Sequence, residues 1–171
     1  LAGLGVRARA ILASEYEHAS DPTDDGTLLC AVTQSGETAD TLNATRAAHQ
    51  AGARTLAVTN VVGSSVTRET DDAVYIRAGP EIGVAATKTF SSQAVSLSLL
   101  VRRIAQDLGH EPGTSVADAP AFADALADLP GQLDHLLSRT RAESVADRYL
   151  DAEGYFFIGR GLGYPVALEG A

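Results

Sequence analysis

The stretch Thr27-Leu28-Leu29-Cys30-Ala31-Val32-Thr33-Gln34-Ser35-Gly36-Glu37-Thr38 decides the fold of this 171-residue chain. Its first six residues form a largely apolar run, which predicts a buried strand of the kind found in parallel sheets. A turn rich in hydroxyl groups follows, and the Ala-rich residues 39–51 have helical spacing. The order strand, turn, helix opens a βαβ unit.

The turn at residues 33–38 has the composition of an anion-binding loop. Backbone N–H groups at a helix N-terminus attract anions. Thr33, Ser35 and Thr38 add hydroxyl donors, and Gly36 lets the backbone approach a ligand closely. Because the turn contains no Lys or Arg, we predict a phosphate held by neutral donors and the helix dipole. The alternative is an ordinary strand–helix turn in which a threonine caps the helix.

Short apolar strands alternate with helices over the first 108 residues. Strands are predicted at residues 6–12, 28–32, 55–59 and 73–77, helices at residues 39–50 and 87–108, and a helical turn at residues 64–69. Strand, helix and strand with short connections form a right-handed βαβ unit. We therefore expect an α/β fold, a doubly wound parallel sheet with helices on both faces.

The composition changes after residue 108. Residues 109–118 resemble a linker, and two acidic helices rich in Ala and Leu are predicted near residues 120–129 and 133–150. A strand is predicted at residues 155–158, followed by a turn and a helix that Pro165 opens. The turn Gly159-Arg160-Gly161-Leu162-Gly163 is not a dinucleotide fingerprint, because Tyr164 stands where the third glycine is required.

Composition narrows the class of protein. A net charge of −9 with no basic stripe argues against nucleic acid as a partner. No apolar run is long enough to span a membrane, and no signal peptide opens the sequence. The single cysteine, Cys30, excludes an internal disulfide framework, which fits the cytoplasm. The four histidines have no carboxylate or cysteine at metal-ligand spacing, so we expect no metal site. We also expect no cofactor.

Three motifs resemble the sugar isomerase (SIS) family. Ser35-Gly36-Glu37-Thr38 after a strand is similar to the phosphosugar loop of that family. Two further motifs resemble, more specifically, the isomerase half of the glutamine–fructose-6-phosphate aminotransferase family: Asn60-Val61-Val62-Gly63-Ser64-Ser65 and Gly79-Pro80-Glu81-Ile82-Gly83-Val84-Ala85-Ala86-Thr87-Lys88. The resemblance implies a first SIS domain, flavodoxin-like, in residues 1–108 without its N-terminal strand and turn. Residues 109–150 would be linker and helices, and residues 151–171 the start of a second SIS domain.

The resemblance also implies which residues bind substrate. Thr33, Gln34, Ser35 and Thr38 match the family's phosphosugar-contacting positions. The backbone around Val84 matches a segment that lines the sugar site.

By the same resemblance, the chain holds no catalytic residue. The base, lysine and histidine of the family fall at positions beyond residue 171, and Glu81 and Lys88 are expected to serve the structure. The sequence contains no methionine and ends within a predicted helix. We therefore expect a fragment that is inactive by itself.

The implied parent enzyme makes glucosamine 6-phosphate from fructose 6-phosphate and glutamine, by amidotransfer and ketose–aldose isomerisation. The resemblance further implies a cytoplasmic homodimer and a separate glutaminase domain. Two alternatives remain open: an SIS-type glucosamine-6-phosphate deaminase, and a non-catalytic domain that senses phosphosugars in a regulator.

Overall fold

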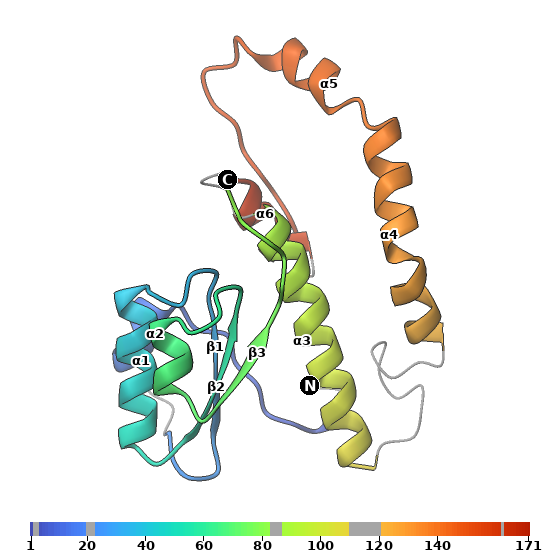
Figure 1. Cartoon of the computed structure of the whole chain (residues 1–171). Helices are drawn as coiled ribbons and strands as arrows, with labels where there is room; N and C mark the ends of the chain where they lie inside the picture. The colour runs from blue at the N-terminus through green and yellow to red at the C-terminus, as the bar shows by residue number, and fades with distance from the viewer. Residues whose placement is uncertain (2–3, 20–22, 83–86, 110–120, 162) are drawn as a thin grey trace. The chain divides into compact units, whose positions relative to one another are not determined.

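The computed structural model describes residues 1, 4–19, 23–82, 87–109, 121–161 and 163–171. The chain divides into two compact units, Leu1–Phe122 and Ala123–Ala171. The first contains the sheet with its helices (Figure 1). No helix among the described residues is long and apolar enough to cross a membrane.

Three parallel strands form the sheet of the first unit, in the order β1-β2-β3. They are β1 (Leu28–Val32), β2 (Arg54–Thr59) and β3 (Asp72–Tyr75). Since β2 is flanked on both sides, every residue of it after Arg54 is buried. The parallel pairing predicted for these three segments is confirmed.

Helices cover both faces of this sheet, as predicted. Helix α1 (Ala39–Gln50) contacts β1 and β2, and the short α2 (Ser65–Glu69) contacts β2. Figure 1 shows both on one side of the sheet and α3 (Thr87–Asp107) on the other. The core between sheet and α2 is built from small side chains, with Ala31, Ala57 and Val66 at its centre. Small side chains allow the connections at the strand ends to approach one another closely.

Two predicted strands do not form. Residues 6–12 have no strand pairing, and the 3-10 helix η2 (Ala13–His18) that follows them packs on α1. Residues 155–158 are not in a strand either, and Phe156 is 96% exposed. Both strand predictions are wrong, because an apolar run becomes a strand only where a neighbouring edge supplies backbone partners.

Three further helices lie among the described residues after α3: α4 (Ala121–Arg139), α5 (Ala142–Tyr149) and α6 (Gly163–Gly170). We predicted a helix end before Pro130, but α4 continues through it. A proline inside a helix removes one hydrogen bond and strains one turn without always ending the helix. The division into residues 1–108, 109–150 and 151–171 stays a prediction.

Candidate functional site

Two loops meet at the carboxyl ends of the strands. Residues 33–38 connect β1 to α1, and residues 60–64 connect β2 to α2. In open parallel sheets, ligands bind outside the carboxyl ends of the strands. The predicted anion loop therefore lies at the edge of the sheet where a ligand is expected.

The first half of this loop is fixed to β2 by backbone hydrogen bonds. The Thr33 N–H donates to the Val58 carbonyl at 3.0 Å. The Gln34 carbonyl accepts from the Asn60 N–H at 3.1 Å and from the Thr59 hydroxyl at 3.3 Å. Three hydrogen bonds to one neighbouring strand end leave this part of the loop little freedom.

Gly36 allows the loop to pack closely against α2. Its φ of 71° lies in the left-handed region, and its carbonyl accepts from the Val66 N–H at 3.0 Å. A Cβ at this position would lie 2.3 Å from Ser64 Oγ and 2.8 Å from Val66 Cγ1. Glycine is therefore required here both by the backbone conformation and by the lack of space.

Thr38 occupies the N-cap position of α1 without capping the helix through its side chain. Its carbonyl accepts from the Leu42 N–H at 3.1 Å, but its hydroxyl makes no capping hydrogen bond. The first N–H groups of a helix have no intrahelical acceptors. The exposed Thr38 hydroxyl and these N–H groups are thus placed to bind an anion, whereas the alternative of a simple threonine cap requires a hydrogen bond that is not formed.

The other predicted loop residues differ in exposure. Thr33 is 8% exposed, and its hydroxyl accepts from the Gly36 N–H at 3.2 Å. Ser35 is partly exposed, and its hydroxyl accepts from the Glu37 N–H at 3.2 Å. Gln34 is also partly exposed. The four predicted loop residues are thus brought together, while Val84 lies outside the described residues.

Sequence reasoning missed the contact between Glu37 and Ser65. Glu37 Oε1 accepts from the Ser65 N–H at 2.8 Å, and Oε2 accepts from the Ser65 hydroxyl at 2.6 Å. These hydrogen bonds, first that of the hydroxyl, lower the pKa of Glu37 below its usual value. In the sequence, the only indication of this contact is that Glu37 directly follows the loop glycine and that Ser65 follows Gly63-Ser64.

A second contact links the loop after β2 to the segment after β3. Asn60 Oδ1 accepts from the Ala78 N–H at 2.9 Å, and Asn60 Nδ2 donates to the Gly79 carbonyl at 2.7 Å. Further along, Glu81 accepts from the Thr89 N–H at 3.0 Å near the start of α3. Lys88 donates to the Pro80 carbonyl. Both contacts agree with the structural roles expected for Glu81 and Lys88.

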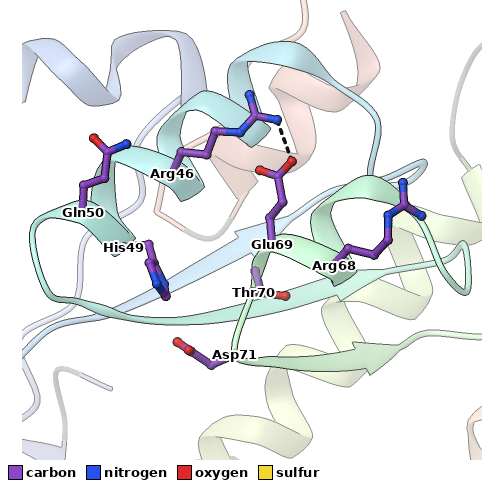
Figure 2. A pocket seen from close by; sticks show the side chains of 7 residues that line it. All are labelled: Arg46, His49, Gln50, Arg68, Glu69, Thr70 and Asp71. Carbon is purple, nitrogen blue, oxygen red and sulfur yellow. Dashed lines mark hydrogen bonds and ion pairs between the residues drawn. The ribbon is translucent and has the colours of Figure 1, made fainter.

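A shallow groove of about 440 Å³ lies between α1 and the segment that leads into β3 (Figure 2). It is lined by Arg46, His49, Gln50, Arg68, Glu69, Thr70 and Asp71. Arg46 and Glu69 form an ion pair at 2.6 Å, which raises the pKa of Arg46. Because these two charges already neutralise each other, the groove is a weaker candidate for an anion site than the loop.

Two further features concern reactive side chains, namely the Cys30 thiol and the grouping of candidate metal ligands. Burial raises the pKa of the Cys30 thiol, which therefore stays neutral and packs as a small apolar side chain within β1. In the part of the chain that the structure describes, no three or more His, Cys, Asp or Glu side chains are grouped to hold a metal ion.

The sequence matches the family described as SIS domain over residues 6–103. It is 51% identical over 161 residues to glutamine–fructose-6-phosphate aminotransferase (isomerizing) of Halobacterium salinarum, covering 94% of this chain and 26% of the relative. It is 44% identical over 168 residues to the enzyme of the same name from Methanosarcina mazei, and this match covers 98% of this chain and 27% of the relative. The chain thus spans about a quarter of the length of these curated relatives.

A solved structure shares the fold. The C-terminal domain of glucosamine-fructose-6-phosphate aminotransferase from Francisella tularensis superimposes with a TM-score of 0.88 at 34% identity. The match covers 98% of this chain and 47% of that one.

Proposed function

The chain belongs to the SIS domain family, and we propose that its residues 33–38 bind the phosphate of a sugar phosphate. One observation carries the proposal: among the described residues, the N-terminus of α1 has no side-chain cap, and the exposed N-cap residue Thr38 makes no capping hydrogen bond. A helix N-terminus with exposed N–H groups and a neutral hydroxyl suits a phosphate dianion.

The proposed parent enzyme makes glucosamine 6-phosphate from fructose 6-phosphate and glutamine. Support comes from the curated relatives, which bear the name glutamine–fructose-6-phosphate aminotransferase (isomerizing) at 44–51% identity. In this proposal the enzyme is a cytoplasmic homodimer, and glutamine binds to a glutaminase domain outside these residues. Such names favour amide transfer over the two alternatives, a deaminase and a regulatory sensor.

In this reaction, the loop acts as an anchor. A phosphate bound to Thr38, Ser35 and the α1 N–H groups fixes the C6 end of the sugar. The reacting carbons, C1 and C2, are then held in a constant position relative to the groups that move protons. We assign none of those groups to this chain, and we expect the 171 residues alone to form no glucosamine 6-phosphate, even with added ammonia.

The test is isothermal titration of the full-length protein with fructose 6-phosphate and with inorganic phosphate. Thr38→Val keeps the shape of the side chain but removes one donor to a charged acceptor. Such a bond is worth about 1.5–3 kcal/mol, or roughly ten- to more than a hundredfold in affinity. Ser35→Ala should act in the same direction.

The affinities for fructose 6-phosphate and for inorganic phosphate should fall together, because the lost hydrogen bond is to the phosphate. Ser14→Ala, in the exposed part of η2, is the control and should leave both affinities unchanged. Affinities within twofold of wild type for Thr38→Val would mean that the phosphate binds elsewhere. Deamination of glucosamine 6-phosphate without glutamine-dependent synthesis by the wild type would favour the deaminase.

A further inference from the structure

The proposed phosphate loop carries a negative charge of its own. Glu37 lies between Gly36 and Thr38, while the loop contains no Lys or Arg. A carboxylate near a bound phosphate lowers its affinity through like-charge repulsion. Because Glu37 would weaken phosphate binding in this way, we expect its contacts to show a role that offsets the repulsion.

Both oxygens of the Glu37 carboxylate are bound by one residue of another element. The Ser65 N–H and the Ser65 hydroxyl donate to them at 2.8 Å and 2.6 Å. Arg68 Nη2 in turn donates to Ser65 Oγ at 3.0 Å, so a cation supports the same contact. Hydrogen bonds to an ionised acceptor are among the stronger ones in proteins. Glu37 therefore joins the loop after β1 to the first residue of α2.

This contact caps the start of helix α2, whose own N-cap residue provides no side-chain cap. Ser64 occupies its N-cap position but makes no capping hydrogen bond through its side chain. Ser64 Oγ is buried against Gly36 and finds no partner among the described residues. The Ser65 N–H, an orphan donor at the helix start, is satisfied by Glu37 instead.

We propose that Glu37 is a positioning residue for phosphosugar binding. By binding Ser65 it fixes residues 33–38 in the conformation that presents the Thr38 hydroxyl and the α1 N–H groups to the phosphate. The backbone bonds at Thr33 and Gln34 hold the first half of the loop, and Glu37 holds the second half. This inference rests on the proposed function.

The experiment titrates variants of the full-length protein with fructose 6-phosphate and with inorganic phosphate. Glu37→Ala should lower the affinity for both ligands by about tenfold. Glu37→Gln should show a smaller loss, since the amide oxygen can accept one of the two hydrogen bonds. In turnover, the loss should appear in kcat/KM, because the anchor both binds the phosphate and holds C1 and C2 in position.

The matched control is Asp40→Asn. Asp40 is an exposed carboxylate in the first turn of α1, so this variant removes the same charge close to the same loop. If charge alone mattered, both variants would bind phosphate slightly more tightly. We expect this only for Asp40→Asn, whereas Glu37→Ala should change affinity in the opposite direction.

A double-mutant cycle tests the contact itself. Ser65→Ala removes the hydroxyl and leaves the N–H, and it should weaken binding in the wild-type background. In the Glu37→Ala background it should have no further effect, because the contact is already lost. A merely structural role would lower the melting temperature while leaving the affinity of the folded protein unchanged.

The possible failures are distinguishable. If Thr38→Val loses affinity but Glu37→Ala stays within about twofold of wild type, the proposed function stands and this inference is wrong. If the wild type binds neither ligand, the proposed function fails and the inference with it. Should Glu37→Ala not fold, Glu37→Gln decides: a partial loss of affinity supports the inference, and unchanged affinity overturns it.

Discussion

The loop at residues 33–38 and the groove of Figure 2 both place polar groups on α1, at its opposite ends. In the groove, Arg46 is bound to Glu69, and Asp71 accepts from the Thr55 N–H of β2 at 2.7 Å. In the loop, backbone groups are bound to the rest of the fold, whereas within the described part of the chain no side chain caps the start of α1 and the Thr38 hydroxyl makes no capping hydrogen bond.

The comparison separates polar groups that are bound within the fold from polar groups that we propose bind a ligand. The groove contains more charged side chains than the loop. However, Arg46 and Glu69 neutralise each other and Asp71 is bound to Thr55, so few of its charges are available to a ligand. A loop with unsatisfied donors on a rigid base, whose one carboxylate is already bound to Ser65, can bind an anion without first breaking an ion pair. Stability should therefore respond to changes in both regions, and phosphosugar binding only to changes in the loop.

The largest effect is expected from Gly36→Ala. The new Cβ would meet Ser64 Oγ at 2.3 Å, in a backbone conformation with φ of 71°. Left-handed strain costs about 1–2 kcal/mol and overpacking about 1–3 kcal/mol, so the free energy of unfolding should fall by roughly 2–5 kcal/mol. Urea unfolding measures the loss, and titration should show that fructose 6-phosphate binding is lost as well.

Gly63→Ala is the matched control, because Gly63 has a φ of 72° and no atom within 4 Å of the new Cβ. Gly63→Ala should lower the free energy of unfolding by the conformational strain alone, about 1–2 kcal/mol. Equal losses for the two variants would show that the close approach of the loop to α2 is not needed.

The strands and the loop could be predicted from the sequence because their signals are local. The apolar run ending at Val32, the polar residues after it and the helical spacing beyond together specify a βα unit. The parallel order of β1, β2 and β3 followed from short connections. Thr38 at the start of α1 could be predicted for the same reason.

Long-range contacts could not be predicted in this way. Glu37 and Ser65 are separated by 28 positions, so neither residue alone indicates the other. Residues 155–158 have the pattern of a strand, but pattern says nothing about whether an edge is available for pairing. Local chemistry predicts elements, whereas tertiary contacts decide which side chains are already bound.

A smaller effect is expected from Asp71, whose contribution to stability depends on pH. The Thr55 N–H and then the Thr55 hydroxyl hold the pKa of Asp71 below its ordinary value of 3.8. A lowered pKa in the folded state adds stability that is fully present above pH 3.8 and is lost as the pH falls through the folded value. Unfolding by urea at several pH values should show this decline, and Asp71→Asn should flatten it.

The neighbouring Asp72 provides a control for the loss of one carboxylate. Asp72→Asn removes the same charge one position away, at the exposed start of β3. It should leave the decline at low pH in place. If Asp71→Asn does not flatten the curve, the contact with Thr55 contributes nothing to acid stability.

The smallest effect on binding is expected at the ion pair of the groove. Arg46→Met removes the guanidinium while keeping an aliphatic stem of similar length. The pair is half exposed, with 52% and 27% of the side chains of Arg46 and Glu69 accessible, and pairs of this kind stabilise little. Because Glu69 Oε2 is buried and has no hydrogen-bond partner among the residues that the structure describes, Arg46→Met should still destabilise more than the double variant Arg46→Met/Glu69→Gln.

Fructose 6-phosphate affinity should stay within about twofold of wild type in Arg46→Met, since long-range charge effects on an exposed site are screened. Titration at two salt concentrations separates this weak field effect from direct contact. A loss of tenfold or more that persists at high salt would place the phosphate in the groove. The loop would then be an ordinary strand–helix turn, and the distinction between bound and available polar groups would fail for this protein.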